Sequence, residues 1–297
     1  MISLIDFSQV AISAVMVCEK EIKSSDNKKD LIKHIILNQL LGFKKKFGGQ
    51  LIVCCDGRNY WRKKEFPYYK GHRKHQKSES TFDWKLIYEV LDEIKVELVD
   101  NFPYKVIEVE EAEADDIIAT LVQYFDENEL TNTGLVEEPQ GIVIVSTDGD
   151  YQQLQKYPNV KQWGNVAKKF IVCKNPKQHL IEYICSGQTK DNIPSIVNPD
   201  QWAKDRSENI PTRGKPLKSS RMLEFYHKGY DACLNEEEQR NWKRNELLLD
   251  FDSIPPAIHN KIVSAYINYE VKGSKRKVWD YLQSKRMKML LGEAGSF

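Results

Sequence analysis

The sequence lacks the features of a helical membrane protein and of a zinc protein. No apolar run reaches the ~18 residues that a membrane-spanning helix needs. The six cysteines include no C-x-x-C pair, and no histidine cluster has zinc-binding spacing. The thiols are therefore expected to be reduced. Met1 leads directly into "ISLIDF", without the basic segment and apolar core of a signal peptide, so we expect a cytoplasmic protein that does not contact membranes.

An excess of one charge is also missing. The chain has 44 Lys and Arg against 43 Asp and Glu, so its total charge does not indicate a nucleic-acid partner and the distribution of charge has to be considered instead. Its 297 residues suffice for one large domain or two smaller ones, and 41% hydrophobic with 29% charged residues is typical of a globular protein.

Apolar segments alternate with helical patterns in the first part of the chain. Strands are expected at 2–6, 50–56, 104–109 and 142–145, helices at 30–43, 84–94 and 111–125, and a loop at 126–140. Continuously apolar strands that alternate with helices predict an α/β domain over 1–175, with a central, mostly parallel sheet flanked by helices. From about residue 176 the patterns are helical, which predicts a mostly α portion over 176–297.

Acidic residues follow the ends of the expected strands. Asp6 ends the first strand, Asp56 follows the second, and Asp148 and Asp150 follow the apolar run in "GIVIVSTDGDYQQL". Glu113, Asp115 and Asp116 come after the third strand, and Asp191 lies in "TKDNIPSI". The carboxyl ends of parallel strands share one edge of a sheet, where ligands bind. The alternative is a set of unrelated turns and helix caps, for which Asp and Asp-Gly are common.

A cluster of carboxylates would be destabilised by mutual repulsion unless it bound a cation. Oxygen ligands without His or Cys favour Mg²⁺, for which Mn²⁺ can substitute. Two such ions ~3.5–4 Å apart can clamp the attacking and leaving oxygens of a phosphodiester.

Two basic segments are candidates for nucleic-acid binding. Residues 58–77 contain one acid, Glu65, and interleaved aromatic residues among eight cations, which are Arg58, Arg62, Lys63, Lys64, Lys70, Arg73, Lys74 and Lys77. Cations bind phosphates and aromatic rings stack on bases, although a solvated surface segment with inward-packed rings explains the same pattern. A shorter run at 213–221 contains Arg213, Lys215 and Lys218.

Five segments, in this order, resemble the acidic motifs of the 5′-nuclease or flap endonuclease superfamily, and most closely its phage members. They are "LIDFSQVAIS", "CCDGRNYWRKKEFPYYKGHR", "EAEADDIIATLV", "IVSTDGDYQQL" and "KDNIPSI". The resemblance implies a PIN-like fold with a helical arch at about 57–100 and a helix–three-turn–helix in the C-terminal portion. It also implies hydrolysis from free 5′ ends with two Mg²⁺ ions, removing RNA primers (ribonuclease H activity) and 5′ flaps in phage DNA replication.

The resemblance assigns roles to individual residues. Asp6, Asp56, Glu113, Asp115 and Asp148 would serve a first metal ion, and Asp150 and Asp191, with Asp116 nearby, a second. Lys70 and Arg73 would be the catalytic cations at the scissile phosphate. Nucleic acid would be bound by Lys33, Arg58, Arg62, Lys63, Tyr69, Lys74, Arg213, Lys215 and Lys218. Gln188 stands where many phage members carry a further Asp, and the Gly-rich turn of the fifth motif is absent.

The expected partners are DNA and RNA–DNA hybrids with 5′ ends or flaps, and replication proteins such as a single-strand binding protein or a clamp. We expect a monomer in the cytoplasm of a bacterial host. A DNA-binding protein whose catalysis is impaired through Gln188 is the alternative. A phosphatase that needs a second Asp two residues after its nucleophile is excluded, because Phe7 and Ser8 follow Asp6.

Overall fold

A computed structural model describes residues 1–78, 80, 82–128 and 140–297. The chain forms two compact units, each described below by itself. The sheet unit comprises Met1–Arg58, Asp83–Val172 and Ala257–Phe297, and the helical unit comprises Asn59–Phe82 and Cys173–Pro256. Residues 129–139, within the loop expected at 126–140, lie outside the described residues. In the part of the chain that is described, no helix combines the length and apolarity needed to cross a membrane.

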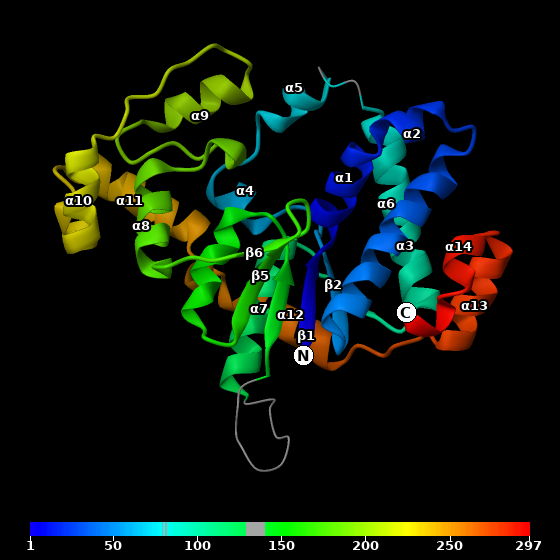
Figure 1. Cartoon of the computed structure of the whole chain (residues 1–297). Coiled ribbons are helices and arrows are strands. Elements are labelled where there is room, and N and C mark those ends of the chain that lie inside the picture. Colours follow the sequence, from blue (N-terminus) through cyan, green and yellow to red (C-terminus); the bar gives the residue numbers. More distant parts are fainter. Residues whose placement is uncertain (79, 81, 129–139) are drawn as a thin grey trace. The chain divides into compact units, whose positions relative to one another are not determined.

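The sheet unit contains a six-stranded sheet with the order β3-β2-β1-β4-β5-β6. Its strands are β1 (Ile2–Asp6), β2 (Gln50–Cys55), β3 (Lys105–Glu108), β4 (Ile142–Val145), β5 (Val160–Gly164) and β6 (Lys169–Ile171). Every neighbouring pair is parallel except β5 and β6. The mostly parallel α/β sheet predicted from the sequence is therefore confirmed (Figure 1).

Helices cover this sheet. They are α1 (Phe7–Val17), α2 (Glu19–Ser24), α3 (Lys28–Phe47), α6 (Trp84–Asn101), α7 (Ala114–Glu127), η1 (Gly149–Lys156), α12 (Pro256–Ile267), α13 (Lys275–Ser284), α14 (Lys288–Leu291) and η5 (Ala294–Ser296). Helices α1, α3 and α6 pack against one another, whereas α7 packs on β1, β2 and β3. From β1 to β3 the chain moves across the sheet in one direction, and from β3 to β4 it moves back in the other. Because parallel crossovers are right-handed, α7, which connects β3 to β4, covers the opposite face of the sheet.

The strand order places a switch point between β1 and β4. From β1 the chain continues to β2 and β3 on one side, and from β4 it continues to β5 and β6 on the other. Leu4, Ile5, Val53, Ile144 and Val145 are fully buried in the centre of the sheet. The apolar side chains thus fix the strands, and the residues that follow β1 and β4 lie at the strands' carboxyl ends, where open α/β sheets bind ligands.

The helical unit contains no strand among its described residues. Its elements are α4 (Trp61–Glu65), α5 (Arg73–Ser78), α8 (Pro176–Ser186), η2 (Thr189–Asp191), α9 (Asp200–Ser207), α10 (Ser219–Lys228), η3 (Gly229–Ala232), α11 (Glu236–Leu249) and η4 (Phe251–Ser253). The motif "KDNIPSI", which is predicted to lie at the helix–three-turn–helix, spans the end of η2 and the turn that follows it, in the stretch between α8 and α9. Asn192 joins it to the loop before α5, because its side-chain amide donates to the carbonyl oxygens of Tyr68 and Ala203.

Two segments of the chain belong to a different unit from the one expected from the predicted domain boundary between residues 175 and 176. Residues 257–297 belong to the sheet unit, where the Tyr266 ring packs 5.2 Å from that of Phe125 and Lys105 Nζ donates to the Tyr266 carbonyl at 2.8 Å. Residues 59–82 belong to the helical unit, where Phe66 packs in a buried cluster with Leu248. The arch expected at about 57–100 therefore contributes α4 and α5 to one unit and α6 to the other.

Gly57, which follows Asp56, lies in a tightly packed part of the sheet edge formed by the carboxyl ends of the parallel strands. Its N–H donates to the Ala112 carbonyl at 2.9 Å, and an added Cβ would lie 2.0 Å from the Val109 carbonyl oxygen. We expect Gly57→Ala to lower the free energy of unfolding by about 1–3 kcal/mol in urea denaturation, because the backbone must move apart. Gly42→Ala in α3, where a Cβ meets open space, is the control and should be stabilising. Equal unfolding midpoints for the two variants would contradict this packing.

Candidate metal centre

Asp6 occupies the switch point as the last residue of β1 and the N-cap of α1. Its Oδ1 accepts a hydrogen bond from Gln9 N at 3.2 Å, as a helix cap does. Its Oδ2 accepts one from Ser146 Oγ at 3.0 Å. Ser146 directly follows β4, which pairs with β1 in parallel, so the register of the two strands brings these groups together. Capping and strand pairing together fix the Asp6 carboxylate.

Asp148 and Asp150 lie at the start of η1. Asp148 Oδ1 accepts from Asp150 N at 3.1 Å, so the carboxylate of Asp148 caps this turn. The backbone before the turn is held from β5, where the buried Gln162 donates Nε2 to the carbonyls of Ser146 at 3.0 Å and Asp148 at 2.6 Å. The turn interpretation of this segment is thus correct, and it also orients the acids.

Three carboxylates converge beside Asp6. Asp115, Asp148 and Asp150 each place a carboxylate oxygen within 4.8 Å of the others, the one such acidic group in the described part of the chain. Asp56 joins this edge from β2, because its Oδ1 accepts from Ala114 N at 2.9 Å at the start of α7. Strand ends from three parts of the sequence therefore meet where the strand order predicts.

Tyr151, which is not among the residues selected from the sequence, connects Asp115 with Asp6. Its side chain is fully buried, and its hydroxyl lies 2.6 Å from Asp115 Oδ1 and 3.2 Å from Asp6 Oδ2. Burial, followed by the charges of Asp115 and Asp6, raises the pKa of Tyr151 well above its usual value, so the hydroxyl stays a hydrogen-bond donor. Its position directly after the two acids of "TDGDY" is the available signal. For Gln162 the local sequence offers none.

The crowding of acids changes the titration of Asp6. Burial, followed by the charges of Asp56 and Asp148, raises its pKa to about 7. The hydrogen bonds from Gln9 N and Ser146 oppose it by stabilising the carboxylate. A cation at this edge would remove the repulsion that raises this pKa.

Glu113 and Asp116 have a different local role. Both are buried at the start of α7 and form a capping box, in which each carboxylate accepts the backbone N–H of the other residue. The bond from Glu113 N to Asp116 Oδ2 measures 2.9 Å. Neither residue belongs to the group of three converging carboxylates. Their burial therefore has a structural explanation that does not need a metal ion.

Asp191 lies in the helical unit with the two predicted catalytic cations. Its Oδ1 is 2.7 Å from Arg73 Nη2 and 3.7 Å from Lys70 Nζ, and its carbonyl accepts from Lys70 N. Gln188 forms an isolated β-bridge with Ile193 in the same unit. Asp191 is thus an ion-pair partner of Arg73 and Lys70, whereas the resemblance assigns Asp191 to a metal ion and these two cations to the scissile phosphate.

Three of the predicted nucleic-acid contacts have other partners. Lys33 is 4% exposed and its Nζ lies 2.8 Å from Glu93 and 2.9 Å from Glu97, so its charge is already paired inside the sheet unit. Arg62 is buried and donates to the Leu248 carbonyl at 2.8 Å. Tyr69 packs in the apolar cluster of the helical unit. Burial and these contacts give the three side chains structural roles, and their predicted contact with nucleic acid stays a prediction.

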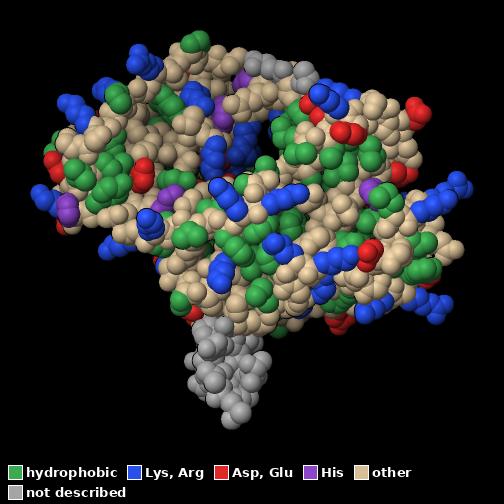
Figure 2. Space-filling model, viewed as in Figure 1, with side chains coloured by type: hydrophobic (Ala, Val, Ile, Leu, Met, Phe, Trp, Pro, Cys, Tyr) green, Lys and Arg blue, Asp and Glu red, His purple; other side chains and the backbone are tan. Residues whose placement is uncertain are grey.

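The remaining predicted contacts are accessible. Arg58, Lys63, Lys74, Arg213, Lys215 and Lys218 are exposed. Lys215 is held through its backbone, since its N–H donates to Asn198 Oδ1 at 2.6 Å and its carbonyl accepts from Asn198 Nδ2 at 3.0 Å. Figure 2 shows Lys and Arg side chains spread over the displayed face with acidic ones among them, in keeping with the balanced total charge.

Comparison with known proteins agrees with this arrangement. Residues 1–180 match the family described as 5′-3′ exonuclease, N-terminal resolvase-like domain, and residues 175–297 match the family described as T4 RNase H, C terminal. The chain is 32% identical to Ribonuclease H of Enterobacteria phage T4, over 100% of this chain and 95% of that one. It is 28% identical to the flap endonuclease Xni of Shewanella woodyi, over 50% of this chain and 53% of that one.

Solved structures support the fold. A complex of bacteriophage T5 flap endonuclease with DNA and metal ions matches with a TM-score of 0.59 at 16% identity, over 96% of this chain and 99% of that one. T5 5′-exonuclease with bound zinc matches with a TM-score of 0.60 at 16% identity, over 90% and 98%. With the family match over residues 1–180 and an acidic cluster suited to metal ions, the chain belongs to the 5′-3′ exonuclease family and is a metal-dependent nuclease that hydrolyses phosphodiester bonds.

Proposed function

We propose that this protein is a Mg²⁺-dependent 5′-nuclease that removes RNA primers and 5′ flaps during phage DNA replication. The observation that carries the proposal is the convergence of Asp115, Asp148 and Asp150 at the switch point, beside Asp6 and Asp56. The proposal extends to RNA–DNA hybrids because its phage T4 relative is a ribonuclease H, and to 5′ flaps because other relatives are flap endonucleases.

The donor set fits a hard divalent cation. Each converging side chain offers carboxylate oxygen, with no His or Cys among the three, and such sites favour Mg²⁺ or Mn²⁺ over zinc. Asp6, Asp56, Asp115 and Asp148 would hold a first ion, and Asp150 a second. When bound, the ions would supply a nucleophilic hydroxide at neutral pH and neutralise charge on the phosphate.

The chain's own residues prepare this chemistry. The Tyr151 hydroxyl lies within hydrogen-bonding distance of Asp115 and Asp6, and as a donor it orients Asp115 relative to Asp6. We further propose that Arg73 and Lys70 contact the phosphate. In the helical unit Arg73 pairs with Asp191, so Asp191 would be available to a metal ion only if this ion pair opened. Glu113 and Asp116 support the site by fixing the first turn of α7.

The wider setting is proposed from the relatives. We propose that residues 1–175 carry the metal site and 176–297 bind DNA, consistent with separate family matches over 1–180 and 175–297. The protein would act as a monomer in the cytoplasm of a bacterial host, beside a single-strand binding protein or clamp.

A single assay tests the function. Labelled 5′-flap, nicked and RNA–DNA hybrid substrates are incubated with the full chain in Mg²⁺, in Mn²⁺ and in EDTA. We expect release of products from the 5′ end in either metal and none in EDTA. DNA binding without cleavage in either metal would instead favour the binding protein suggested by Gln188.

Asp148→Asn tests the metal assignment. Asparagine keeps the capping oxygen of η1 but removes a ligand charge, so we expect folding to be retained and cleavage to fall by at least about a hundredfold. Circular dichroism and a flap-cleavage assay measure the two effects. Asp26→Asn, at an exposed acid, is the matched control. Cleavage by Asp148→Asn at the wild-type rate would show that the assignment is wrong.

Asp6→Asn tests whether the charge of the buried Asp6 carboxylate destabilises the fold, through the pH dependence of stability. The folded-state pKa of about 7 lies above the ordinary value of 3.8, so ionising Asp6 destabilises the fold as pH rises from 4 to 7. In EDTA at pH 8 we expect Asp6→Asn to be more stable than the wild type by about 1–3 kcal/mol, since one pKa unit corresponds to about 1.4 kcal/mol. The difference should vanish near pH 4.

Urea denaturation at each pH measures this difference, with Asp26→Asn as the exposed control. Saturating Mg²⁺ should stabilise the wild type and reduce or reverse the advantage of the variant. A stability difference that does not change between pH 4 and pH 8 would contradict the raised pKa.

A further inference from the structure

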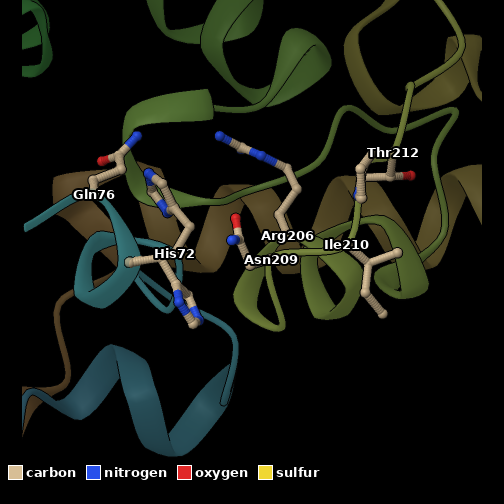
Figure 3. Close-up of a pocket in the computed structure, with 8 residues that line it drawn as sticks. His72, Gln76, Arg206, Asn209, Ile210 and Thr212 are labelled. Carbon is tan, nitrogen blue, oxygen red and sulfur yellow. The ribbon is translucent and has the colours of Figure 1, made fainter. Parts of the chain in front are cut away.

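A pocket of about 250 Å³ lies entirely within the helical unit, between α5 with its preceding turn and the end of α9 with the loop that follows (Figure 3). The side chains that matter for its chemistry are His72, Gln76, Arg206, Asn209, Ile210 and Thr212. None of them belongs to the residues assigned above to the metal ions or to nucleic acid. The pocket is therefore a feature that the proposed function leaves unexplained.

Arg206 is a fixed cation in this pocket. Its Nη1 donates to the Thr189 carbonyl and to Asn192 Oδ1, both at 3.2 Å, and its guanidinium lies 4.6 Å from the centre of the Trp202 ring. These contacts hold the side chain while leaving Nη2 and Nε without a hydrogen-bond partner among the described residues. Figure 3 shows the guanidinium extending toward the side of the pocket that carries Gln76. A planar donor held in this way is suited to phosphate oxygens.

His72 adds an unsatisfied polar atom. The residue is 6% exposed, and its Nδ1 has no hydrogen-bond partner among the described residues. Burial, together with the charges of Arg206 and Arg73, lowers its pKa to about 4, so the imidazole is neutral at pH 7. A buried polar atom without a partner destabilises the folded protein, and a polar ligand that supplies one would relieve this.

The rest of the lining selects the class of ligand. No Asp or Glu lines the pocket, which disfavours a cation, and the side-chain amides of Gln76 and Asn209 and the Thr212 hydroxyl can donate to an anion. Ile210 and the neighbouring Pro211 add an apolar wall. The volume exceeds what a phosphate ion alone would fill. An anionic group attached to a flat or apolar body matches this combination.

We propose that this pocket binds a nucleotide, with its phosphate on Arg206 and its sugar or base against Ile210 and Pro211. The nucleotide is either free or part of a single strand. The pocket lies in one unit and needs no metal ion, so the proposal does not depend on cleavage. Its failure and that of the nuclease assignment are separately observable.

Calorimetric titration of the full chain in EDTA tests the proposal, with inorganic phosphate, adenosine 5′-monophosphate and a short single-stranded oligonucleotide as probes. We expect the monophosphate to bind more tightly than inorganic phosphate. Gln76→Glu and Asn209→Asp each place a negative charge beside the bound phosphate. We therefore expect each substitution to lower the affinity for the monophosphate by about five- to tenfold. Gln178→Glu, an exposed change of the same charge on α8, is the control and should bind as the wild type does.

The outcomes separate the alternatives. If the oligonucleotide binds with the same sensitivity to Gln76→Glu, the pocket holds a nucleotide of a strand, and if only the monophosphate is sensitive, it holds a free nucleotide. Equal affinities for inorganic phosphate and the monophosphate would overturn a nucleotide ligand. No binding by the wild type, or equal loss in Gln178→Glu and Gln76→Glu, would overturn the site itself.

Discussion

Repulsion between carboxylates at one edge of the sheet is the constraint on which much of the sheet unit depends. Asp6 is buried beside Asp56 and Asp148, and burial together with these two charges raises its pKa to about 7. The fold tolerates this because hydrogen bonds from Ser146, Tyr151 and backbone amides hold the oxygens in place. The same repulsion that weakens the metal-free protein provides the driving force for binding divalent ions, so stability and function are coupled at this edge.

Much of this arrangement follows from local sequence. Continuous β-branched runs define the central strands, and parallel order then brings their carboxyl ends to one edge whatever the intervening sequence. Asp6 and Asp148 could be selected because Asp6 ends one apolar strand and Asp148 lies three residues after the end of another. Strands β5 and β6 were not predicted. The polar Lys161 and Gln162 interrupt the apolar pattern of β5, and β6 is three residues long and pairs antiparallel with β5.

What could not be predicted depends on long-range partners. Lys33 looks like an available cation in sequence, yet Glu93 and Glu97 pair with it from a helix some sixty residues away along the chain. Tyr69 looks like a ring for stacking, yet it fills the core of the helical unit beside Leu248. Composition and spacing identify chemical capability. Whether a side chain remains accessible is decided by tertiary neighbours, which a local motif does not encode.

Gln162 gives β5 a part in the site although this strand contributes no acid. By donating to the Ser146 and Asp148 carbonyls, it anchors the backbone that carries Asp148 and Asp150, the proposed metal ligands at the start of η1. Ion binding then does not have to order a loose loop, so little conformational entropy is lost in the process. An enzyme in which the backbone around its metal ligands keeps its conformation when ions and product phosphates dissociate can begin the next catalytic cycle without reordering that backbone.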